Sequence, residues 1–270
     1  MPEAPEVKII TDQLNYLLKG KTINKFTLLK NSKFIKHKPD GFDEFNKALP
    51  LKIINIKSKG KMIYFVLSNG WFIINKLGLS GGWFLEKLPR NNAVEMETTG
   101  RTFYFNDPRH YAYFKFTNDE NEMNKELNSL GPDFLSDKIS PNLFLERLNE
   151  KKNLKKPIYE VLADQSVFSG IGNYLRAEIL YAAKINPNRK TEDIKNPLDI
   201  LVIGQKIIKD AYKHHGASLQ NYYDVNHNKG SFQDFLKVYD KKVDPLGNKV
   251  EKIKTKDERN VYWVPAVQTN

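Results

Sequence analysis

The residues best suited to covalent chemistry stand at the start of the chain, which begins Met1-Pro2-Glu3. If Met1 is removed, Pro2 presents a secondary amine with Glu3 beside it. An unperturbed α-amino group has a pKa of roughly 7.7–8.0, so part of it is uncharged and nucleophilic near neutral pH. Such an amine can attack an aldehyde-level sugar carbon to give an iminium, which promotes elimination, while Glu3 moves protons. Proline after an initiator Met is also common without any chemical role.

An amphipathic helix is positioned to hold this amine. Apolar residues recur at helical spacing between Pro5 and Lys19, Pro5 suits the first turn, and Gly20 suits the C-terminal cap. The apolar positions are Val7, Ile10, Leu14, Leu17 and Leu18. Glu6 falls in the first turn, so we expect it to support the site from beside the amine.

The segment that follows reads mostly as strands, because Ile, Phe, Tyr and Val dominate its apolar runs. We expect strands at Thr22–Leu29, Leu51–Lys57, Lys61–Leu67, Trp71–Lys76, Ala93–Glu97 and Thr102–Asn106. Ser68–Gly70 and Thr98–Gly100 resemble hairpin turns. The pattern predicts an antiparallel β-sandwich or barrel.

Four residues among these strands could contact a nucleic acid. Lys61 follows Gly60 at a strand start, where its ammonium could meet a phosphate or shuttle a proton. Leu79 sits at the apolar tip of a glycine-containing loop. Arg109 and Tyr111 follow a strand and could occupy a gap in a duplex, as wedging side chains do. Taken singly, the two loops read more simply as an ordinary turn and a surface Arg.

Helical patterns replace strands after Leu130, where we place a domain boundary. The expected helices are Pro141–Lys151, Pro157–Asp164, Tyr174–Lys184, Leu198–His215 and Phe232–Tyr239. Between the second and third, Gly172 and Asn173 open a helix whose backbone N–H groups suit phosphate binding, and Lys155 lies upstream. A Gly-x-Gly turn could also serve only tight helix packing.

The end of the chain reads as a basic hairpin after a polar segment, Ser218–Ser231, that could be a mobile loop. Its strands are expected at Lys249–Lys254 and Val261–Val264, with Asp257–Asn260 at the tip. Arg259 on this tip could reach DNA or remain a solvated charge.

Charge and composition narrow the class of protein. The 270 residues carry a formal charge of +11 and the pI is about 9.4, which favours a polyanionic partner. A merely lysine-rich protein would show the same excess. The absence of cysteine excludes disulfides and thiolate metal sites. No apolar run is long enough to span a bilayer and no signal peptide is evident, so we expect a soluble intracellular monomer without membrane contacts.

In combination, these segments resemble the formamidopyrimidine-DNA glycosylase and endonuclease VIII family. The resemblance runs in order through nearly the whole chain: Pro2-Glu3, Lys61 after a glycine, Leu77–Gly81, Asp107-Pro108-Arg109, and the string Gly170–Leu180 of a helix-two-turns-helix motif. It implies a two-domain α+β fold and a bifunctional DNA glycosylase and abasic-site lyase of base-excision repair. Damaged double-stranded DNA would be the partner, and no cofactor or metal is implied.

The resemblance also implies a role for each matched residue. Pro2 would attack C1′ of the damaged nucleotide, and Glu3 would be the acid/base group. Lys61 would contact phosphate and donate a proton in β-elimination, and Arg259 would hold the phosphate and assist δ-elimination. The remaining DNA contacts would come from Leu79, Arg109, Tyr111, Lys155, Gly172 and Asn173. The usual pattern has phenylalanine where this chain has Tyr111.

The end of the chain departs from the family. Most members close with a four-cysteine zinc finger, and Leu246, Val264 and Val267 stand near three of those positions. We therefore expect a zincless finger held by apolar packing, as in endonuclease VIII-like members, and by the same kinship a preference for oxidised pyrimidines and hydantoins over 8-oxoguanine.

The predicted division is a catalytic sandwich at 1–130, a helix-two-turns-helix domain at 131–240 and a hairpin at 241–270. Two alternatives remain open: a lesion- or structure-specific DNA-binding protein without chemistry, and a nucleic-acid adaptor that shares only the helical motif. Neither needs Pro2, Glu3 and Lys61 together.

Overall fold

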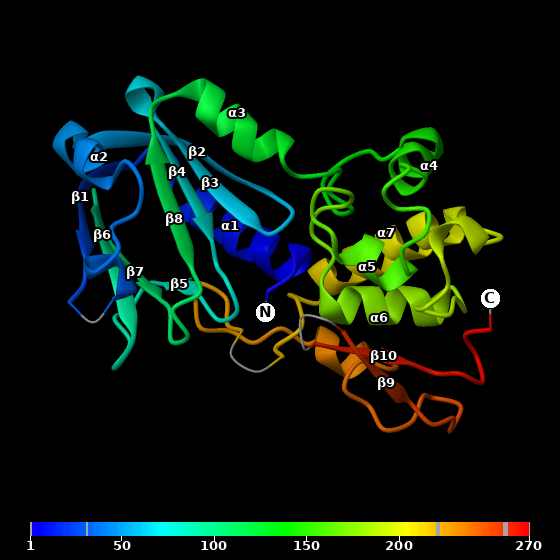
Figure 1. Ribbon diagram of the computed structural model, residues 1–270. Helices are drawn as coiled ribbons and strands as arrows, with labels where there is room; N and C mark the ends of the chain where they lie inside the picture. Colours follow the sequence, from blue (N-terminus) through cyan, green and yellow to red (C-terminus); the bar gives the residue numbers. More distant parts are fainter. Residues whose placement is uncertain (1, 31, 220–221, 256–258, 270) are drawn as a thin grey trace.

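The computed structural model describes residues 2–30, 32–219, 222–255 and 259–269 (Figure 1). A strand-rich half and a helical half lie side by side, and the chain starts between them. None of the described helices is long and apolar enough to cross a membrane. The predicted hairpin tip at Asp257 and Glu258 lies outside the described residues.

Helix α1 (Ala4–Leu18) forms where the apolar spacing predicts it. Val7, Ile10 and Leu14 are buried in the core of the strand-rich half. The helix ends before Gly20, whose φ of +83° is a backbone conformation that glycine adopts at little cost. The sequence therefore places α1 against the sheet, with its first turn facing the helical half.

One antiparallel sheet of eight strands forms the N-terminal half, in the order β5-β7-β6-β1-β2-β3-β4-β8. The strands are β1 (Thr22–Leu28), β2 (Leu51–Lys59), β3 (Met62–Leu67), β4 (Phe72–Lys76), β5 (Gly82–Phe84), β6 (Asn92–Thr98), β7 (Thr102–Asn106) and β8 (Tyr113–Thr117). All six predicted strands are present. β5 and β8 were not predicted, because one is only three residues long and the other directly follows the 107–111 turn.

The sheet folds over itself into the predicted sandwich. β1 and β2 pair only at Thr22↔Lys52 and Ile23↔Leu51, so the two strands separate beyond these residues and the sheet divides into two layers. Phe26 of β1 packs edge-on against Phe116 of β8, with ring centroids 5.2 Å apart, although β8 is the far edge strand. Aromatic side chains from both layers thus fill one core.

Several short elements were not predicted. They are α2 (Phe42–Ala48), α3 (Glu120–Asn128), η1 (Lys33–Ile35) and η3 (Thr191–Asp193), whereas η2 (Ser68–Gly70) is the turn expected between β3 and β4. Such elements carry too few apolar positions for a periodic signal.

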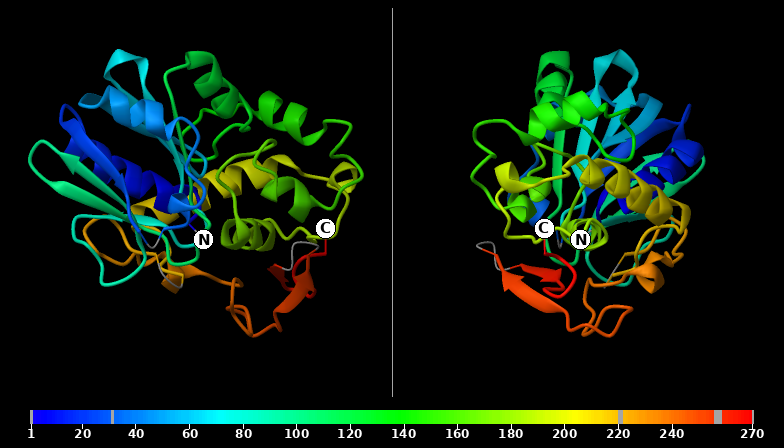
Figure 2. Two further views of the ribbon diagram at one scale, coloured as in Figure 1. Left: turned by 60° about the vertical axis from the view of Figure 1, so that its left-hand side comes forward. Right: turned by 90° about the vertical axis from the view of Figure 1, so that its right-hand side faces the viewer.

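The C-terminal half packs four helices around a second core (Figure 2). They are α4 (Pro141–Leu148), α5 (Ile158–Ala163), α6 (Asn173–Ala182) and α7 (Leu198–Lys213). Phe144 and Phe168 stack within this core with their centroids 4.9 Å apart, and Phe134 packs edge-on against both. The four helices match the predicted ones and end one to three residues earlier.

The helix predicted at Phe232–Tyr239 is wrong. Only a 3₁₀ turn, η4 (Phe232–Phe235), forms there. The backbone N–H groups of Lys237, Val238 and Tyr239 donate to the Glu178 carboxylate at 2.8–2.9 Å instead of to a helix. Because Glu178 lies on α6, this long-range contact overrides the local helical pattern.

The final hairpin pairs β9 (Glu251–Lys254) with β10 (Asn260–Trp263) in antiparallel register. Val250, Tyr262 and Val264 pack on Ala177 and Tyr181 of α6. The hairpin is thereby fixed to the same helix whose N-terminus faces the start of the chain.

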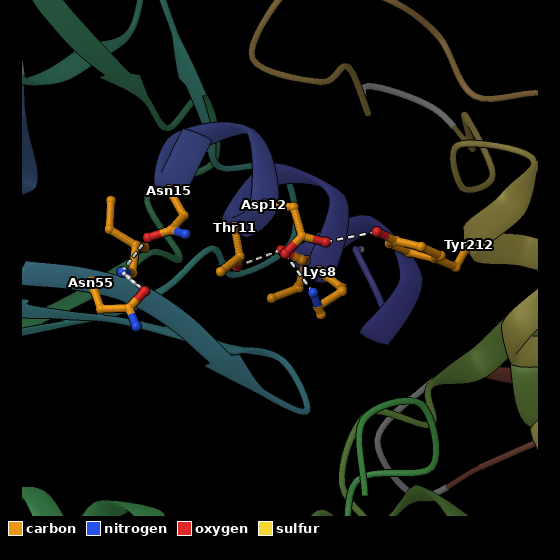
Figure 3. Close-up of polar contacts among 8 residues, drawn as sticks. Lys8, Thr11, Asp12, Asn15, Asn55 and Tyr212 are labelled. Atoms are coloured by element: carbon orange, nitrogen blue, oxygen red, sulfur yellow. Dashed lines mark hydrogen bonds and ion pairs between the residues drawn. The ribbon is translucent and has the colours of Figure 1, made fainter. Parts of the chain in front are cut away.

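Polar contacts from the middle of α1 reach the C-terminal half. Asp12 accepts hydrogen bonds from Lys8 and, at 2.7 Å, from the Tyr212 hydroxyl of α7 (Figure 3). Gln13 donates to Asp224 at 2.7 Å, in the segment that was expected to be a mobile loop.

From Tyr222 onward this segment is docked, since Tyr222 and Val225 are buried in the sandwich core. A stretch assigned by sequence to the C-terminal half therefore also packs with the N-terminal half. The domain boundaries at 130/131 and 240/241 stay predictions.

Candidate active site

Pro2 lies buried where the two halves meet. It lines a pocket of about 260 Å³ together with Lys61, Lys76 and Gln165. Pro2 also borders a second, narrow pocket that Tyr222 lines. A nucleophile at Pro2 therefore faces open space in the pocket that Lys61 and Lys76 line.

Three glycines bring the two halves into contact around Pro2. The Ala4 N–H donates to the Gly170 carbonyl at 3.0 Å. A Cβ on Gly170 would stand 2.6 Å from the Cβ of Ala4, and one on Gly60 would stand 2.9 Å from the Gly170 nitrogen. A Cβ on Gly172 would stand 2.3 Å from the Glu3 carboxyl carbon. Larger residues at these positions would force the halves apart.

The Glu3 carboxylate binds the N-terminus of α6. It accepts hydrogen bonds from the backbone N–H groups of Gly172 at 2.7 Å, Tyr174 at 2.9 Å and Leu175 at 3.2 Å. A helix N-terminus leaves such groups unpaired and carries a partial positive charge. The glycine turn that sequence analysis assigned to phosphate thus also holds the carboxylate beside Pro2.

Glu6 forms a second buried link between the halves. It accepts hydrogen bonds from the Glu3 N–H at 2.7 Å, the Tyr174 hydroxyl at 2.9 Å and the Ala217 N–H at 2.8 Å. Burial raises the pKa of Glu6 to about 7, and the nearby Glu3 charge adds to the effect. Its contacts fit the supporting position expected for it.

Lys61 approaches the same turn from the start of β3. Its half-buried ammonium donates to the Ile171 carbonyl at 2.8 Å. Burial lowers the pKa of Lys61 to about 8; the Glu3 carboxylate opposes this, and the positive charges of Arg259 and Arg176 add to it. Lys61 is therefore close enough to Glu3 and Arg259 to share one electrostatic site with them.

Arg259 is exposed just before β10, next to the outer end of the hairpin. Its carbonyl accepts from the Thr255 N–H at 2.8 Å, and its N–H donates to the Thr255 hydroxyl at 3.1 Å. These bonds fix the backbone on both sides of residues 256–258. The hairpin thus places the positive charge of Arg259 near enough to Lys61 to lower its pKa.

Asn173 and Arg176 form a polar group on the first turn of α6. The Asn173 side-chain oxygen accepts from the Arg176 guanidinium at 2.7 Å. Arg176 is buried, donates to the Tyr159 carbonyl at 3.3 Å and lies over the Tyr159 ring. Sequence analysis missed Arg176, although it lies within the diagnostic Gly170–Leu180 string.

Lys155 makes its contact elsewhere. Its exposed ammonium, between α4 and α5, pairs with Glu192 of η3 at 2.6 Å. Lys155 therefore does not contact the cluster around Pro2. A DNA duplex would have to extend across the helical half to contact both.

The two predicted wedge loops lie against each other. A Cβ on Gly78 would stand 2.6 Å from the Tyr111 carbonyl carbon, so the Leu79 turn packs directly on the 107–111 turn. Asp107 holds that turn by accepting from the Ala112 N–H at 2.9 Å. The Tyr111 side chain is 61% exposed, and Arg109 is exposed beside it.

The hairpin does not fit a zinc ion. The chain has no cysteine, and no group of three or more His, Asp or Glu side chains suited to a metal occurs among the described residues. Val264 is buried and Val267 packs beside it, as predicted, but Leu246 is 77% exposed. Asp244 holds the turn instead, accepting from the Leu246 N–H and from the Tyr181 hydroxyl.

Comparisons with known proteins decide the family. Three consecutive family models match: the formamidopyrimidine-DNA glycosylase N-terminal domain at residues 1–114, the H2TH domain at 130–221 and the C-terminal domain at 224–269. The chain belongs to the formamidopyrimidine-DNA glycosylase family. It is therefore a DNA glycosylase and abasic-site lyase of base-excision repair.

Relatives named formamidopyrimidine-DNA glycosylase match along nearly their full lengths. The Mycoplasma mobile protein is 32% identical over 94% of both chains. The Ureaplasma parvum protein is 32% identical over 99% of this chain and all of its own. The endonuclease VIII-like placement of this glycosylase stays a prediction, since these relatives carry the other family name.

Solved structures share the fold. MutM (Fpg) from Thermus thermophilus superposes with a TM-score of 0.85 at 24% identity, covering 99% of this chain and 98% of its own. A Lactococcus lactis Fpg variant bound to DNA containing Fapy-dG gives 0.87 at 23%, with both chains fully covered. The α+β architecture with two halves is thus that of the family.

Proposed function

We propose that this glycosylase excises oxidised bases through a Schiff base on Pro2 and then cuts the strand by β,δ-elimination. The observation that supports this most is the convergence of Pro2, Glu3 and Lys61 on the N-terminus of α6. The proposal requires removal of Met1, because an acylated Pro2 nitrogen is not nucleophilic.

In the first step the Pro2 amine attacks C1′ and the C1′–N bond to the base breaks. The leaving base takes a proton and the amine loses its own; the C1′–O4′ bond then breaks as O4′ takes a second proton, leaving an iminium between Pro2 and the opened sugar. Glu3 is the group that exchanges these protons, and its position is fixed by the α6 N–H groups.

In the second step the iminium acidifies C2′, whose proton is removed while the 3′ C–O bond breaks. Lys61 donates the proton that this departure needs and contacts the phosphate. Arg259 binds the phosphate of the same nucleotide and assists loss of the 5′ oxygen. The lowered pKa of Lys61, about 8, suits proton transfer near neutral pH.

The remaining contacts hold the DNA open. Extrusion of a base costs a few kcal/mol, so the gap has to be filled. Leu79, Arg109 and Tyr111 fill it from two adjoining turns. Gly172, Asn173 and Lys155 bind the backbone from the helical half.

The relatives and the missing cysteines point to different classes of lesion. The relatives are named for formamidopyrimidines, and DNA complexes of two neighbours contain Fapy-dG and carbocyclic 8-oxo-G. We therefore include ring-opened and oxidised purines as substrates. The preference for oxidised pyrimidines and hydantoins, predicted from the missing cysteines, competes with this assignment.

Single-turnover rates on matched duplexes test both statements. Fapy-dG and 8-oxoguanine opposite cytosine, thymine glycol and an abasic site are compared, with product ends resolved on denaturing gels. Faster purine excision with 3′-phosphate ends supports the purine assignment and β,δ-elimination. A clear preference for thymine glycol restores the pyrimidine prediction. Binding of every duplex without cleavage would establish the non-catalytic alternative.

A further inference from the structure

A groove of about 590 Å³ lies on the helical half, outside the cluster around Pro2. It is bordered by α7, the end of α6 and the η4 turn, and it shares no lining residue with either pocket that Pro2 borders. Its α6 residues include Ala182, which stands about 14 Å along the helix axis from Asn173 at the other end. The groove is therefore separate from the candidate active site.

The walls of this groove are largely apolar. Ile203 and Ile207 come from α7, and Phe232 and Phe235 come from η4. The Phe235 side chain is 53% exposed, and its ring lies against that of His214 with the centroids 4.2 Å apart. Large apolar side chains gathered in this way at a surface mark a site of contact with another molecule.

A row of lysines borders the apolar walls. Lys206, Lys209 and Lys213 recur at helical spacing on α7, and with Val202 they line a second depression of about 400 Å³ that adjoins the groove. Lys237 lines the groove itself, just after η4. Among the described residues, Lys206, Lys209 and Lys237 form no ion pair, so their charges are available to a ligand.

The carboxylates nearby do not neutralise these lysines. Glu178 is buried and is already bound by the backbone N–H groups of residues 237–239. Asp210 lies 3.8 Å from the Lys213 ammonium, so it offsets only one of the four lysines. The groove thus combines apolar walls with an excess of positive charge.

We propose that this groove binds an acidic amphipathic helix of a partner protein. The apolar side chains of that helix would lie between α7 and Phe235, and its carboxylates would lie beside the lysines. α7 presents Ile203 and Ile207 next to Lys206 and Lys209, so a helix laid along α7 meets both rows at once. An apolar centre with a charged rim is the usual composition of such interfaces. This inference is independent of the proposed function.

Two other occupants fit the groove less well. A second copy of this chain carries the same charge of +11, so repulsion opposes self-association through a basic surface. A DNA duplex satisfies the lysines, but its phosphate backbone has no apolar side chains to cover Ile203 and Phe235. The apolar walls therefore favour a protein segment over DNA.

A synthetic peptide tests the proposal with the full-length protein. The peptide has about 16 residues, matching α7, with leucines along one face at helical spacing and glutamates beside them. A scrambled peptide of the same composition, which forms no apolar face, is the control. Binding is measured by fluorescence anisotropy of the labelled peptides. We expect saturable binding of the first peptide and about tenfold weaker binding of the scrambled one.

Two variants locate the binding surface. Phe235→Ala removes an exposed apolar wall and Lys206→Glu reverses one charge, so each should weaken peptide binding about fivefold or more. The loss in Lys206→Glu should shrink as the salt concentration rises. Lys36→Glu makes the same charge change at an exposed position of the N-terminal half and should leave peptide binding unchanged. Melting temperatures establish that each variant is folded.

Binding and cleavage of an abasic-site duplex are measured on the same variants. Phe235→Ala should change neither, and Lys206→Glu should change them no more than Lys36→Glu does. No binding of the designed peptide, equal binding of the scrambled one, or unchanged peptide binding in Phe235→Ala would overturn the inference. A duplex affinity that Lys206→Glu lowers and Lys36→Glu does not would assign the groove to DNA instead. Absence of abasic-site cleavage by the unaltered protein would contradict the proposed function but not this inference.

Discussion

Lys61 carries the most readily tested electrostatic feature of the site. Its folded pKa of about 8 lies below the ordinary lysine value of 10.5, mainly because it is buried. The protonated form, which can contact phosphate and donate a proton, therefore dominates below pH 8 and is lost as the pH rises above it. The Pro2 amine has the opposite requirement, since it must be uncharged to attack.

We predict that abasic-site cleavage declines above about pH 8, and that Lys61→Arg moves this decline upward by at least one pH unit. Arginine stays protonated throughout the range. The profile is measured under single-turnover conditions at constant ionic strength. An alkaline decline at the same pH in the variant would show that another group controls it.

Sequence alone could name the residues that a contiguous motif contains but not those that meet only in space. Pro2, Glu3 and Lys61 were predicted from the resemblance, and the structure brings them to one helix terminus. Ile207 and Phe235 were not singled out, because the groove that they line forms only when α7 packs beside the η4 turn.

At the scale of elements, the N-terminus of α6 is the part on which the site depends. We predict that Gly172→Ala lowers base excision at least tenfold, because its Cβ would stand 2.3 Å from the Glu3 carboxyl carbon. Excision is measured per folded molecule, with folding checked by circular dichroism.

Gly20→Ala is the matched control for that variant. Gly20 has a φ of +83°, and a Cβ added there would have no neighbour within 4 Å, so alanine adds only backbone strain. It should lower the melting temperature without changing excision. If both variants lose activity equally, the effect of Gly172→Ala reflects general stability rather than displacement of Glu3.

The hairpin is a second element whose role can be isolated. We predict that Asp244→Ala lowers both the melting temperature and excision, because Asp244 accepts from Tyr181, Leu246 and Asn248. Arg259→Ala should slow excision without a change in melting temperature, and EDTA should change neither. Asp234→Ala, at an exposed position, is the control. Full activity in Arg259→Ala would remove the hairpin from the mechanism.

Element prediction succeeded where periodicity was long and failed where a distant partner decided the conformation. α1, α7 and the long strands follow their apolar spacing. The stretch after η4 does not continue as a helix because Glu178 binds its backbone. Leu246 was expected to pack in the hairpin, yet the Asp244 carboxylate holds its turn. A polar contact that replaces apolar packing leaves no hydrophobic pattern in the sequence from which it could be predicted.

At the scale of the whole molecule, the charge of +11 predicts DNA affinity that falls steeply with salt. Lys155 tests whether the exposed lysines contact phosphate or only pair locally with Glu192. We predict that Lys155→Ala lowers the slope of log affinity against log salt by about 1. An unchanged slope would show that the ion pair with Glu192 persists in the complex.

The two halves share α1, which follows Pro2 and Glu3, holds Glu6 in its first turn, and bonds through its later turns to Tyr212 and Asp224. The nucleophile is thus positioned by both halves together. The proposed function requires residues near 3, 61, 172 and 259 to act on one nucleotide, and covalent capture at Pro2 is its central claim.

Borohydride reduction on a duplex containing an abasic site tests this claim most directly. The protein is first checked by mass spectrometry for loss of Met1, and Pro2→Gly is run beside it. We predict a covalent protein–DNA adduct whose linked peptide begins at Pro2. An adduct mapped to a lysine, or none at all with a duplex that is tightly bound, would contradict the account.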